Sequence, residues 1–528
     1  MTRSPIRIAR PWLAAALAAS LAPAARAADW PQWGGGPTRN PVSPETGLPL
    51  DFQFPRTGDK GKVVQPARGI TWTARVGDRM VVPPVVADGL VWVCASAAAP
   101  ADETIPDKEW DGGVIACLRE SDGKLHWTHR TPRRAGGGPV DFSRSALGSA
   151  PLVEGDRLWY VNNRNEVVCL DVGPLKRGAG APREVWTLDT VKTLKVFPYL
   201  PVMQFGFAAS VAGYKDRLYV VTHNGVDETH VNVPAPEAPS LICLDKATGR
   251  VVWTDNSPGK TIIEYQISSP LVAEVNGRPQ VIVGQGDGWL RAFDAATGKL
   301  VWKCDLNAKD AVWELAGSGD RNYVVATPIL YENRVYVATG LQVEAGVGPG
   351  RLTCIDPTRT GDVSLELDDG PWQGKPNPNS AVVWHTPKTV PADAPRIEVG
   401  KKKRDLLRSR DFYFGRSIAG CMARDGLVYA ADVQSFLYCF DARTGKLYWA
   451  DDLRAGVRGQ LLWADGKLLV TTENGDLFAY AHGKQNRRLM NVEADAWFIA
   501  GPVFANGTLY LTTETTVHAV RNPKRGGP

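Results

Sequence analysis

A run of ten residues, His223–Asn232, holds the densest group of side chains that could bind a metal ion. Imidazole and carboxylate groups are common ligands of Zn²⁺ and other divalent metals, which makes His223, Asp227, Glu228 and His230 candidate ligands. Their spacing matches no established metal-binding motif. The alternative is an insertion loop in which Asn, Asp and Thr side chains hydrogen-bond their own backbone, and the spacing favours it. A metal-dependent hydrolase built on His223 and His230 would require the first interpretation.

A second group could bind an anionic or sugar-like ligand. These residues stand just before segments typical of β-strands, and they combine guanidinium, amide and phenol groups that suit polar ligands. If the strands lie innermost in a ring of repeated units, the loops before them converge on one mouth of a central channel. The sequence leaves two readings open, a ligand-binding funnel or hydrogen bonds between neighbouring units. The residues are Gln266, Arg321, Asn322, Tyr323, Tyr413 and Arg416.

The elements that position these groups come from a motif that occurs eight times. It consists of a small residue, an apolar residue and usually Asp, followed by a Gly turn and often by Trp. An Asp-Gly, Asn-Gly or similar pair, which suits a two-residue hairpin, precedes each copy. Such a repeat indicates an array of like units. The clearest copies are Cys243–Trp253, Ala292–Trp302 and Cys439–Trp449, and weaker copies centre on Cys117, Cys169, Cys354, Ala479 and Ala519.

Each unit contains four predicted antiparallel strands, as in a propeller blade. We therefore expect an all-β fold, an eight-bladed β-propeller of four-stranded antiparallel blades. The eighth unit lacks a fourth strand after Ala519, and Ile70–Arg75 is a strand-like segment without a unit of its own. This N-terminal strand is expected to close the ring and remove an open sheet edge. A β-solenoid would need shorter and more uniform repeats.

The rest of the chain divides around this propeller at residues 70–521. Residues 1–27 combine a basic start, an apolar run and an Ala-Arg-Ala site, which predicts a signal peptide. Residues 28–69 form an N-terminal extension, about 357–411 a long insertion, and 522–528 a tail. Without a lipobox cysteine or another apolar span, the expected product is a periplasmic or secreted monomer without a transmembrane segment.

Charge and cysteine usage exclude some functions. The formal net charge is +5, and the leader contributes four Arg and no acid, so the processed chain carries 5 − 4 = +1. That balance argues against nucleic acid as a partner. Five of the eight Cys occupy one repeat position that Ala fills in the other three units. Since a disulfide needs Cα atoms within about 7 Å, we predict buried free thiols rather than bridges.

The repeat Asp-Ala-x-Thr-Gly-Lys-x-x-Trp resembles the pyrroloquinoline-quinone (PQQ) type β-propeller superfamily. The segments Asp29–Pro37, Val42–Pro49, Asn224–Asn232 and Gly286–Trp289 resemble exported PQQ-binding-like β-propeller repeat proteins. The superfamily includes PQQ-dependent alcohol and glucose dehydrogenases. It also includes a non-catalytic branch, the outer-membrane assembly lipoproteins of the β-barrel insertion machinery. The resemblance covers essentially the whole chain after the leader.

The dehydrogenases resembled use a disulfide between adjacent cysteines, a Trp floor, Ca²⁺ held by Glu and Asn, and an Asp base. No two Cys are adjacent here, and no calcium ligand set maps onto the sequence. We therefore expect an exported, non-enzymatic binding or scaffold propeller without a cofactor. It would contact a protein, peptide or glycan at a channel mouth and insertion loops. The alternative is a PQQ- and calcium-dependent quinoprotein oxidoreductase, which needs several carboxylates near the channel axis.

Overall fold

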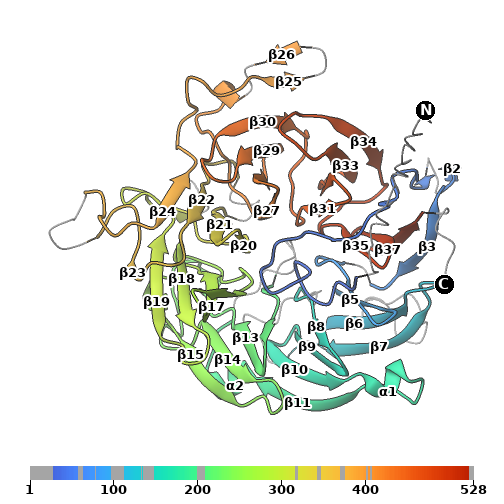
Figure 1. Ribbon diagram of the computed structural model, residues 1–528. Coiled ribbons are helices and arrows are strands. Elements are labelled where there is room, and N and C mark those ends of the chain that lie inside the picture. Colours follow the sequence, from blue (N-terminus) through green and yellow to red (C-terminus); the bar gives the residue numbers. More distant parts are fainter. Residues whose placement is uncertain are drawn as a thin grey trace, which may run out of the picture.

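The computed structural model describes residues 28–57, 63–77, 79–96, 112–132, 134, 148–198, 208–315, 319–341, 346–368, 375–399, 402–404 and 407–522. The predicted signal peptide and residues 523–528 of the predicted tail lie outside these ranges. The strands form eight blades of four antiparallel strands each, and the sheet of blade 4 gains a fifth strand. Figure 1 shows the blades arranged as a ring. The prediction of an all-β, eight-bladed propeller is confirmed.

The strands of each blade follow one another from the inside of the ring to its rim (Figure 1). Blades 1 to 4 are β4 (Val85–Ala87), β5 (Leu90–Ser96), β6 (Gly112–Arg119) and β7 (Leu125–Pro132); β8 (Leu152–Glu154), β9 (Arg157–Val161), β10 (Glu166–Asp171) and β11 (Arg183–Asp189); β12 (Ala212–Tyr214), β13 (Arg217–Val221), β14 (Leu241–Asp245) and β15 (Val251–Asp255); β16 (Leu271–Val275), β17 (Arg278–Gly284), β18 (Trp289–Asp294) and β19 (Leu300–Asp305).

Blades 5 to 8 continue the same order, except that the last blade takes its outermost strand from the N-terminus. They are β20 (Ile329–Tyr331), β21 (Arg334–Ala338), β22 (Leu352–Ile355) and β24 (Val382–His385); β27 (Cys421–Arg424), β28 (Leu427–Ala431), β29 (Phe436–Asp441) and β30 (Leu447–Asp452); β31 (Leu462–Ala464), β32 (Lys467–Thr471), β33 (Asp476–Ala481) and β34 (Arg488–Glu493); β35 (Val503–Ala505), β36 (Thr508–Thr512), β37 (Thr516–Arg521) and β3 (Ile70–Arg75).

The ring is closed as predicted, by pairing of β3 with β37. Trp72 lies opposite Ala519 and Ala74 opposite Val517 in an antiparallel register. This pairing gives blade 8 its fourth strand and leaves no unpaired edge between the two ends of the propeller.

Hairpins between the first and second strands explain the Asp-Gly and Asn-Gly pairs of the repeat. In six of these hairpins both turn residues have positive φ, between +46° and +76°. Gly and Asn adopt this backbone readily, and Asp tolerates it better than most residues. The turn residues therefore fix the register of the two inner strands in each blade.

The Gly and Trp that recur in the repeat form a joint between neighbouring blades. The indole Nε1 of Trp253 in blade 3 donates to the Ala295 carbonyl of blade 4 at 3.1 Å. Its ring packs on the next blade's Gly298, where a Cβ would lie 2.6 Å from the indole. Among the described residues the same bond recurs at four other junctions, through Trp72, Trp186, Trp384 and Trp449.

The remaining short elements lie between or outside the blades. They are β1 (Arg56–Thr57), β2 (Val63–Gln65), α1 (Gly173–Lys176), α2 (Thr190–Leu194), η2 (Gly259–Thr261), β23 (Gly361–Asp362), β25 (Ile397–Val399), β26 (Lys402–Arg404) and η6 (Leu407–Ser409).

The segment predicted as one long insertion, 357–411, is not wholly an insertion. It contains β24, the fourth strand of blade 5, whose Trp384 makes the repeat joint with blade 6. The sequence signal was hidden because 27 residues stand between Asp356 and this Trp, and β23 within them pairs with β19 of blade 4. The hairpin β25–β26 projects from the ring (Figure 1).

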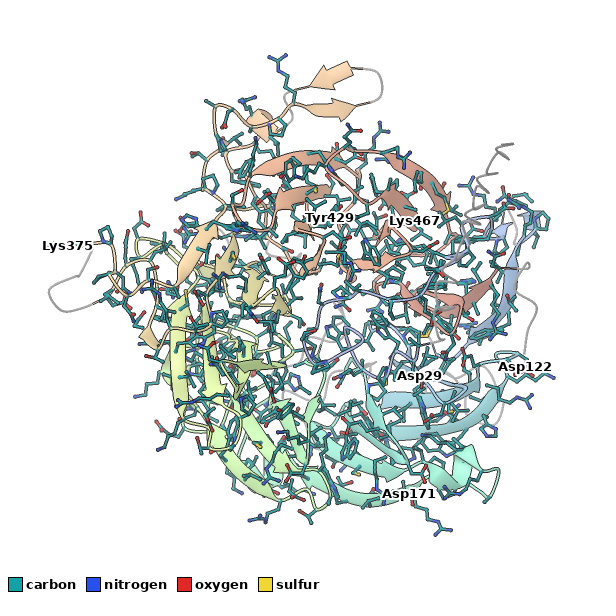
Figure 2. All side chains as sticks on the ribbon, in the orientation of Figure 1. Asp29, Asp122, Asp171, Lys375, Tyr429 and Lys467 are labelled. Atoms are coloured by element: carbon teal, nitrogen blue, oxygen red, sulfur yellow. The ribbon has the colours of Figure 1, made fainter. Side chains whose placement is uncertain are left out.

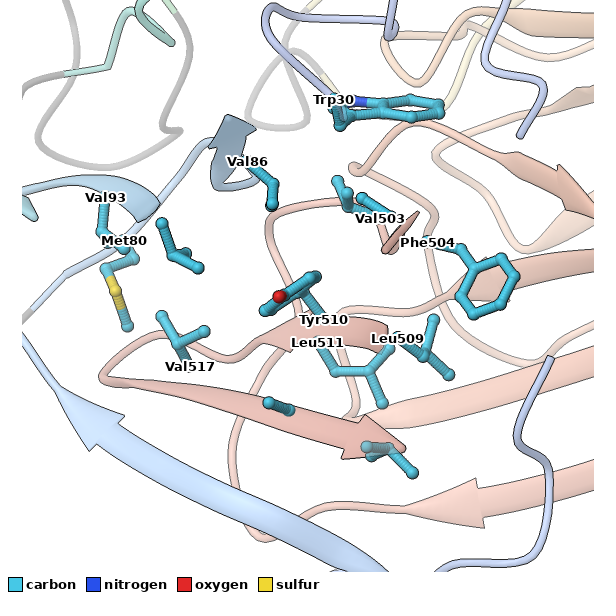
Figure 3. Packing of buried hydrophobic residues seen from close by; sticks show 14 of the residues in the cluster. Trp30, Met80, Val86, Val93, Val503, Phe504, Leu509, Tyr510, Leu511 and Val517 are labelled. Atoms are coloured by element: carbon cyan, nitrogen blue, oxygen red, sulfur yellow. The ribbon is translucent and has the colours of Figure 1, made fainter. Parts of the chain in front are cut away.

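The core lies between the blades, in apolar clusters that join the faces of neighbouring sheets. Figure 3 shows the cluster at the closing junction, where Val86 and Val93 of blade 1 pack near Tyr510 and Val517 of blade 8. Trp30 from the N-terminal extension joins this cluster and is 3% exposed. The extension is therefore part of the core.

Candidate functional site

The antiparallel order of the strands gives the ring two different faces. The hairpins after the first strands and the Gly turns after the third strands lie at one end, here named the hairpin face. The loops after the second strands and the loops that enter each next blade lie at the other end, named the loop face. The predicted funnel residues all belong to the loop face.

The hairpin face is closed by residues 28–45, here named the plug. This segment crosses the centre of the ring (Figure 1). At its start, Trp30 pairs with Val86 of blade 1 through two backbone hydrogen bonds of 2.8 and 2.9 Å, as in an antiparallel sheet. The plug bonds the inner part of every blade in turn, through Trp30, Pro31, Pro37, Thr38, Arg39, Asn40, Pro41, Ser43 and Glu45.

Arg39 holds the plug to two blades at once. It is fully buried, and its guanidinium donates to the carbonyls of Val211 before β12 and Pro270 before β16, at 2.8 and 2.9 Å. It also donates to Trp33 O at 2.6 Å and Gln32 Oε1 at 3.2 Å. Burial lowers the pKa of Arg39 to about 9. The sequence analysis missed this residue, because a single Arg outside the repeat carries no periodic signal.

At the loop face, an apolar cluster occupies the mouth on the side of blades 3 to 6. Tyr323 is fully buried, and its ring meets Tyr265 edge-on with centroids 5.8 Å apart. Gln266 is 1% exposed and donates to Asn224 O at 2.7 Å and Ser240 Oγ at 2.8 Å. The apolar members of this mouth cluster are Val226, Ile262, Tyr265, Ile267, Tyr323, Val325, Leu341 and Ile418.

Arg321 and Asn322 join blade 5 to blade 4. The Arg321 guanidinium lies 3.4 Å from the buried Asp305 carboxylate, which also pairs with Lys309 at 3.0 Å. Asn322 makes two hydrogen bonds with Asn307 across the same junction. The Asn322 N–H donates to Asn307 Oδ1 at 2.8 Å, and the Asn322 carbonyl accepts from Asn307 Nδ2 at 2.8 Å. At this junction the Trp302 indole donates to Gln280 of its own blade and not to a carbonyl of the next blade. The polar bonds of Arg321 and Asn322 therefore join the two blades here.

Arg416 and Tyr413 hold loops around blades 5 and 6. Arg416 is 1% exposed and donates to the carbonyls of Gly319 at 2.8 Å and Gly346 at 3.2 Å. Burial lowers the pKa of Arg416. The Tyr413 carbonyl accepts a hydrogen bond from Arg410 at 2.8 Å. The six predicted residues thus share one face, but their hydrogen bonds and ion pairs tie them to neighbouring loops and blades.

The four candidate metal ligands do not converge. His223 is buried, its Nδ1 lies 2.9 Å from Asn165 Oδ1, and its Nε2 accepts the Ala209 N–H at 3.0 Å. Burial lowers the pKa of His223 to about 3, so the ring is neutral. His230 Nδ1 instead lies 2.6 Å from Glu264 Oε1. Among the described residues, no three His, Cys, Asp or Glu side chains are grouped to hold a metal ion.

Asp227 belongs to the self-bonded loop that the alternative interpretation predicted. Its Oδ2 accepts from Asn232 Nδ2 at 3.1 Å, and its Oδ1 accepts from the hydroxyl of Thr229. These hydrogen bonds, the Thr229 bond first, lower the pKa of Asp227. Glu228 is exposed in the same turn.

The groups at the loop face do not fit a quinone with calcium. All eight Cys are buried free thiols, which confirms the thiol prediction. The buried carboxylates already have partners from the chain: Asp287 pairs with Arg291 at 2.6 Å and Asp432 with Arg410 at 3.1 Å, while Glu264 bonds His230. Three cations, from Arg291, Lys303 and Lys309, lie over the ring of Trp289. A calcium ion would have to displace these pairs.

An open polar groove lies between blades 6 and 7 instead, named groove 6/7. Its volume is about 640 Å³. The Arg488 guanidinium lies 4.5 Å from the centre of the Phe478 ring and 2.8 Å from Asp451 Oδ2, which also accepts the Tyr480 hydroxyl at 2.7 Å. The lining residues are Asp451, Asp452, Leu453, Arg454, Asn474, Asp476, Phe478, Asn486, Arg488 and Asn491.

Groove 6/7 therefore offers amides, carboxylates and guanidiniums beside an aromatic ring. Sequence reasoning missed it, because its residues come from strand ends whose repeat pattern is ordinary. Among the described residues, no helix combines the length and hydropathy of a membrane span.

Comparison with curated proteins finds two distant relatives. Polyvinylalcohol dehydrogenase of Sphingopyxis sp. (strain 113P3) is 28% identical over 224 residues, which are 40% of this chain and 31% of that protein. Tetrathionate hydrolase of Acidithiobacillus ferrooxidans is 24% identical over 289 residues, 52% of this chain and 53% of that protein. The chain thus matches only about a third to a half of the length of these relatives.

Solved structures show the same fold at low identity. BamB from Moraxella catarrhalis has a TM-score of 0.52 and 14% identity, over 85% of this chain and 98% of that one. Quinohemoprotein alcohol dehydrogenase from Comamonas testosteroni has a TM-score of 0.59 and 14% identity, over 96% and 82%. Likeness at this identity supports the fold alone.

The family comparison covers most of the propeller. Residues 111–382, 376–497 and 437–524 match the family described as outer membrane protein assembly factor BamB. These ranges contain the repeats that form the blades from β6 onward. The chain belongs to this family of PQQ-like β-propellers.

Proposed function

We propose that this chain is an exported, non-enzymatic β-propeller that binds a protein partner at groove 6/7. The observation that carries the proposal is the state of the central channel. The plug occupies the hairpin face, and buried side chains of the mouth cluster occupy part of the loop face. Groove 6/7 then provides an open concave surface away from the axis.

The chemistry of groove 6/7 suits a polypeptide. Arg and aromatic side chains are enriched at the centres of protein interfaces, and here Arg488 stacks on Phe478. Asn474 and Asn491 are exposed and carry both donors and acceptors for a partner's backbone. The family description, an assembly factor, points to the same kind of role. A peptide or a glycan would be a different outcome of the same test.

Photo-crosslinking tests this proposal. A photoreactive amino acid replaces Asn491 in groove 6/7. In the matched control the same amino acid replaces Leu300, which is 46% exposed on β19, the fourth strand of blade 4. We expect a cross-linked partner protein from position 491 and none from position 300. Equal cross-linking at both positions, or none in the native host, would reject the groove. Cell fractionation of the same strain tests export directly.

The alternative function is a PQQ- and calcium-dependent oxidoreductase. One of the two curated relatives is described as a dehydrogenase, which supports this alternative. Its test is absorbance and metal analysis of protein purified from the native host, followed by incubation with PQQ and Ca²⁺. We expect no stoichiometric quinone or calcium and no dye-linked alcohol oxidation. Stoichiometric quinone with activity would replace the binding proposal.

A further inference from the structure

The side chain of Glu45 forms a site for the backbone nitrogen of Ala28. Glu45 is 2% exposed, and its Oε1 accepts hydrogen bonds from Ala28 N at 2.6 Å and Asn506 N at 2.7 Å. Its Oε2 accepts from Gly507 N at 2.6 Å. Ala28 and Glu45 are the two ends of the plug, so this contact joins both ends at the first hairpin of blade 8.

The surroundings of this contact are short of positive charge. Asn506 Nδ2 lies 2.9 Å from Asp29 Oδ1 and 3.3 Å from Glu120 Oε2, so carboxylates from Asp29, Glu45 and Glu120 gather around one turn. Within the described residues, none of these three carboxylates has a Lys or Arg side chain within 4.0 Å. Figure 2 labels Asp29 beside the strands of blade 1, where its carboxylate accepts the N–H of Asp88 at 3.1 Å.

Among the other titratable groups nearby, the positive charge of Arg521 acts on Glu120 and opposes the rise of its pKa. The guanidinium of Arg521 donates to the Glu120 carbonyl at 2.9 Å rather than to its carboxylate. Burial raises the pKa of Glu120, and its hydrogen bond from Tyr510 opposes that shift. Burial also raises the pKa of Tyr510 far above its ordinary value, so Tyr510 stays neutral.

We infer that Glu45 binds the N-terminal ammonium that forms on Ala28 when the leader is removed. This inference rests on the proposed export. The predicted site Ala25-Arg26-Ala27 places the cleaved bond before Ala28. A signal peptidase hydrolyses the Ala27–Ala28 peptide bond with one water, Ala27 keeps the carboxylate, and the freed amine takes up a proton. A neutral amide with one N–H thus becomes a cation with three.

Processing then completes the closure of the hairpin face. Before cleavage, Ala28 offers Glu45 one neutral hydrogen bond. After cleavage, the bond is charge-assisted and shielded from water, and it closes residues 28–45 into a loop around Arg39. The folded state therefore distinguishes the processed chain from the precursor at a single charged contact.

A two-by-two set of variants tests the ion pair. The processed chain, starting at Ala28, is compared with the same chain retaining Ala27, each with and without Glu45→Gln. We expect the chain starting at Ala28 to melt several degrees above the other, and Glu45→Gln to remove that difference. Asp51→Asn is the matched control, because the Asp51 side chain is 88% exposed and should leave the difference intact. Equal melting of both chains with intact Glu45 would overturn the inference, and that comparison holds even if Glu45→Gln does not fold.

The pH dependence gives a second readout. A free chain terminus has a pKa of about 8, and pairing with Glu45 raises it in the folded state. Its contribution to stability is complete below about pH 8 and is lost as the pH rises through the raised folded value. Only the chain starting at Ala28 with intact Glu45 should show this loss. The same loss in the chain retaining Ala27 would contradict the proposal.

The terminus of the exported protein separates the two proposals. Mass spectrometry of the fractionated protein should find Ala28 as its first residue. An exported chain that starts elsewhere overturns this inference but leaves the binding proposal standing. A chain that keeps its leader inside the cell overturns the proposed export and this inference together.

Discussion

The two faces of the ring are built in different ways. On the hairpin face, two-residue hairpins and Gly turns recur from blade to blade, and one plug bonds the inner part of every blade. On the loop face, each junction has its own solution, such as the Arg321–Asp305 pair or the mouth cluster. Because the turns are regular, one short segment can form hydrogen bonds with all eight blades. On the loop face, the residues and contacts differ from one blade junction to the next.

The largest expected effect comes from the buried guanidiniums of the two faces. Arg39→Met removes four hydrogen bonds and leaves neutral acceptors buried, and should lower the free energy of unfolding by about 3–5 kcal/mol. Arg416→Met on the loop face should cost less, about 1–3 kcal/mol. Urea unfolding measures both. Arg68→Met, at an exposed ion pair, is the control, and a greater cost at Arg416 would contradict the central role of the plug.

Glycine turns on the hairpin face give the next effect. Gly298→Ala would place a Cβ 2.6 Å from the Trp253 ring, at a residue with φ +72°. Gly277→Ala meets nothing within 4 Å at nearly the same φ, +74°. We expect about 1 kcal/mol for Gly277→Ala from the backbone alone, and about 2–3 kcal/mol for Gly298→Ala. Equal costs in thermal unfolding would mean that the Trp joint is not tightly packed.

On the loop face, His223 should make stability depend on acid. The unfolded chain takes up a proton below a pKa of about 6.5, whereas folded His223 stays neutral down to a pKa of about 3. Because the unfolded state binds the extra proton, stability falls as the pH drops, by about 2 kcal/mol between pH 7 and pH 5. Urea titrations of His223→Gln at both pH values should lack that part of the loss. An unchanged acid loss in the variant would assign it to other groups.

The smallest effect is expected in the core between the two faces. Cys243 lies opposite Trp253 and Tyr219, at the register position that Ala292 and Ala479 occupy in other blades. Cys243→Ala should therefore cost about 1 kcal/mol or less. Thiol titration should find all eight Cys unreactive in the folded protein and reactive after denaturation without reductant. Any protected pair after denaturation would contradict the free thiols.

The sequence predicted what is repeated and missed what is not. Asp-Gly and Asn-Gly pairs, the Trp of most units and the strand Ile70–Arg75 were sufficient for the blades and the ring closure, because local turn chemistry and periodicity specify them. The plug has no period, so its role was not predicted from Arg39 or Glu45. Its partners are inner strands spread over the whole chain.

The loop face was predicted only in part for a related reason. Arg321, Tyr413 and Arg416 were placed on one face by their position before inner strands. Their bonds depend on residues far away in sequence, such as the Gly319 carbonyl, 97 residues before Arg416. Side chains that could line a funnel or join blades have the same sequence signature, so only the partners distinguish the two roles.

Closure by β3 also sets the order in which the molecule can be completed. Thr71 and its hydrogen-bond partner Arg521 are 450 residues apart, so β3 is among the first strands made and pairs with the last. At ribosomal rates of about 5–20 residues per second, β3 waits roughly 20–90 s for its partner. Until β37 has been made the ring cannot close, and the long-range pairing makes closure a late, slow step. Folding of the whole ring therefore acts as a check that the chain has been made to its end.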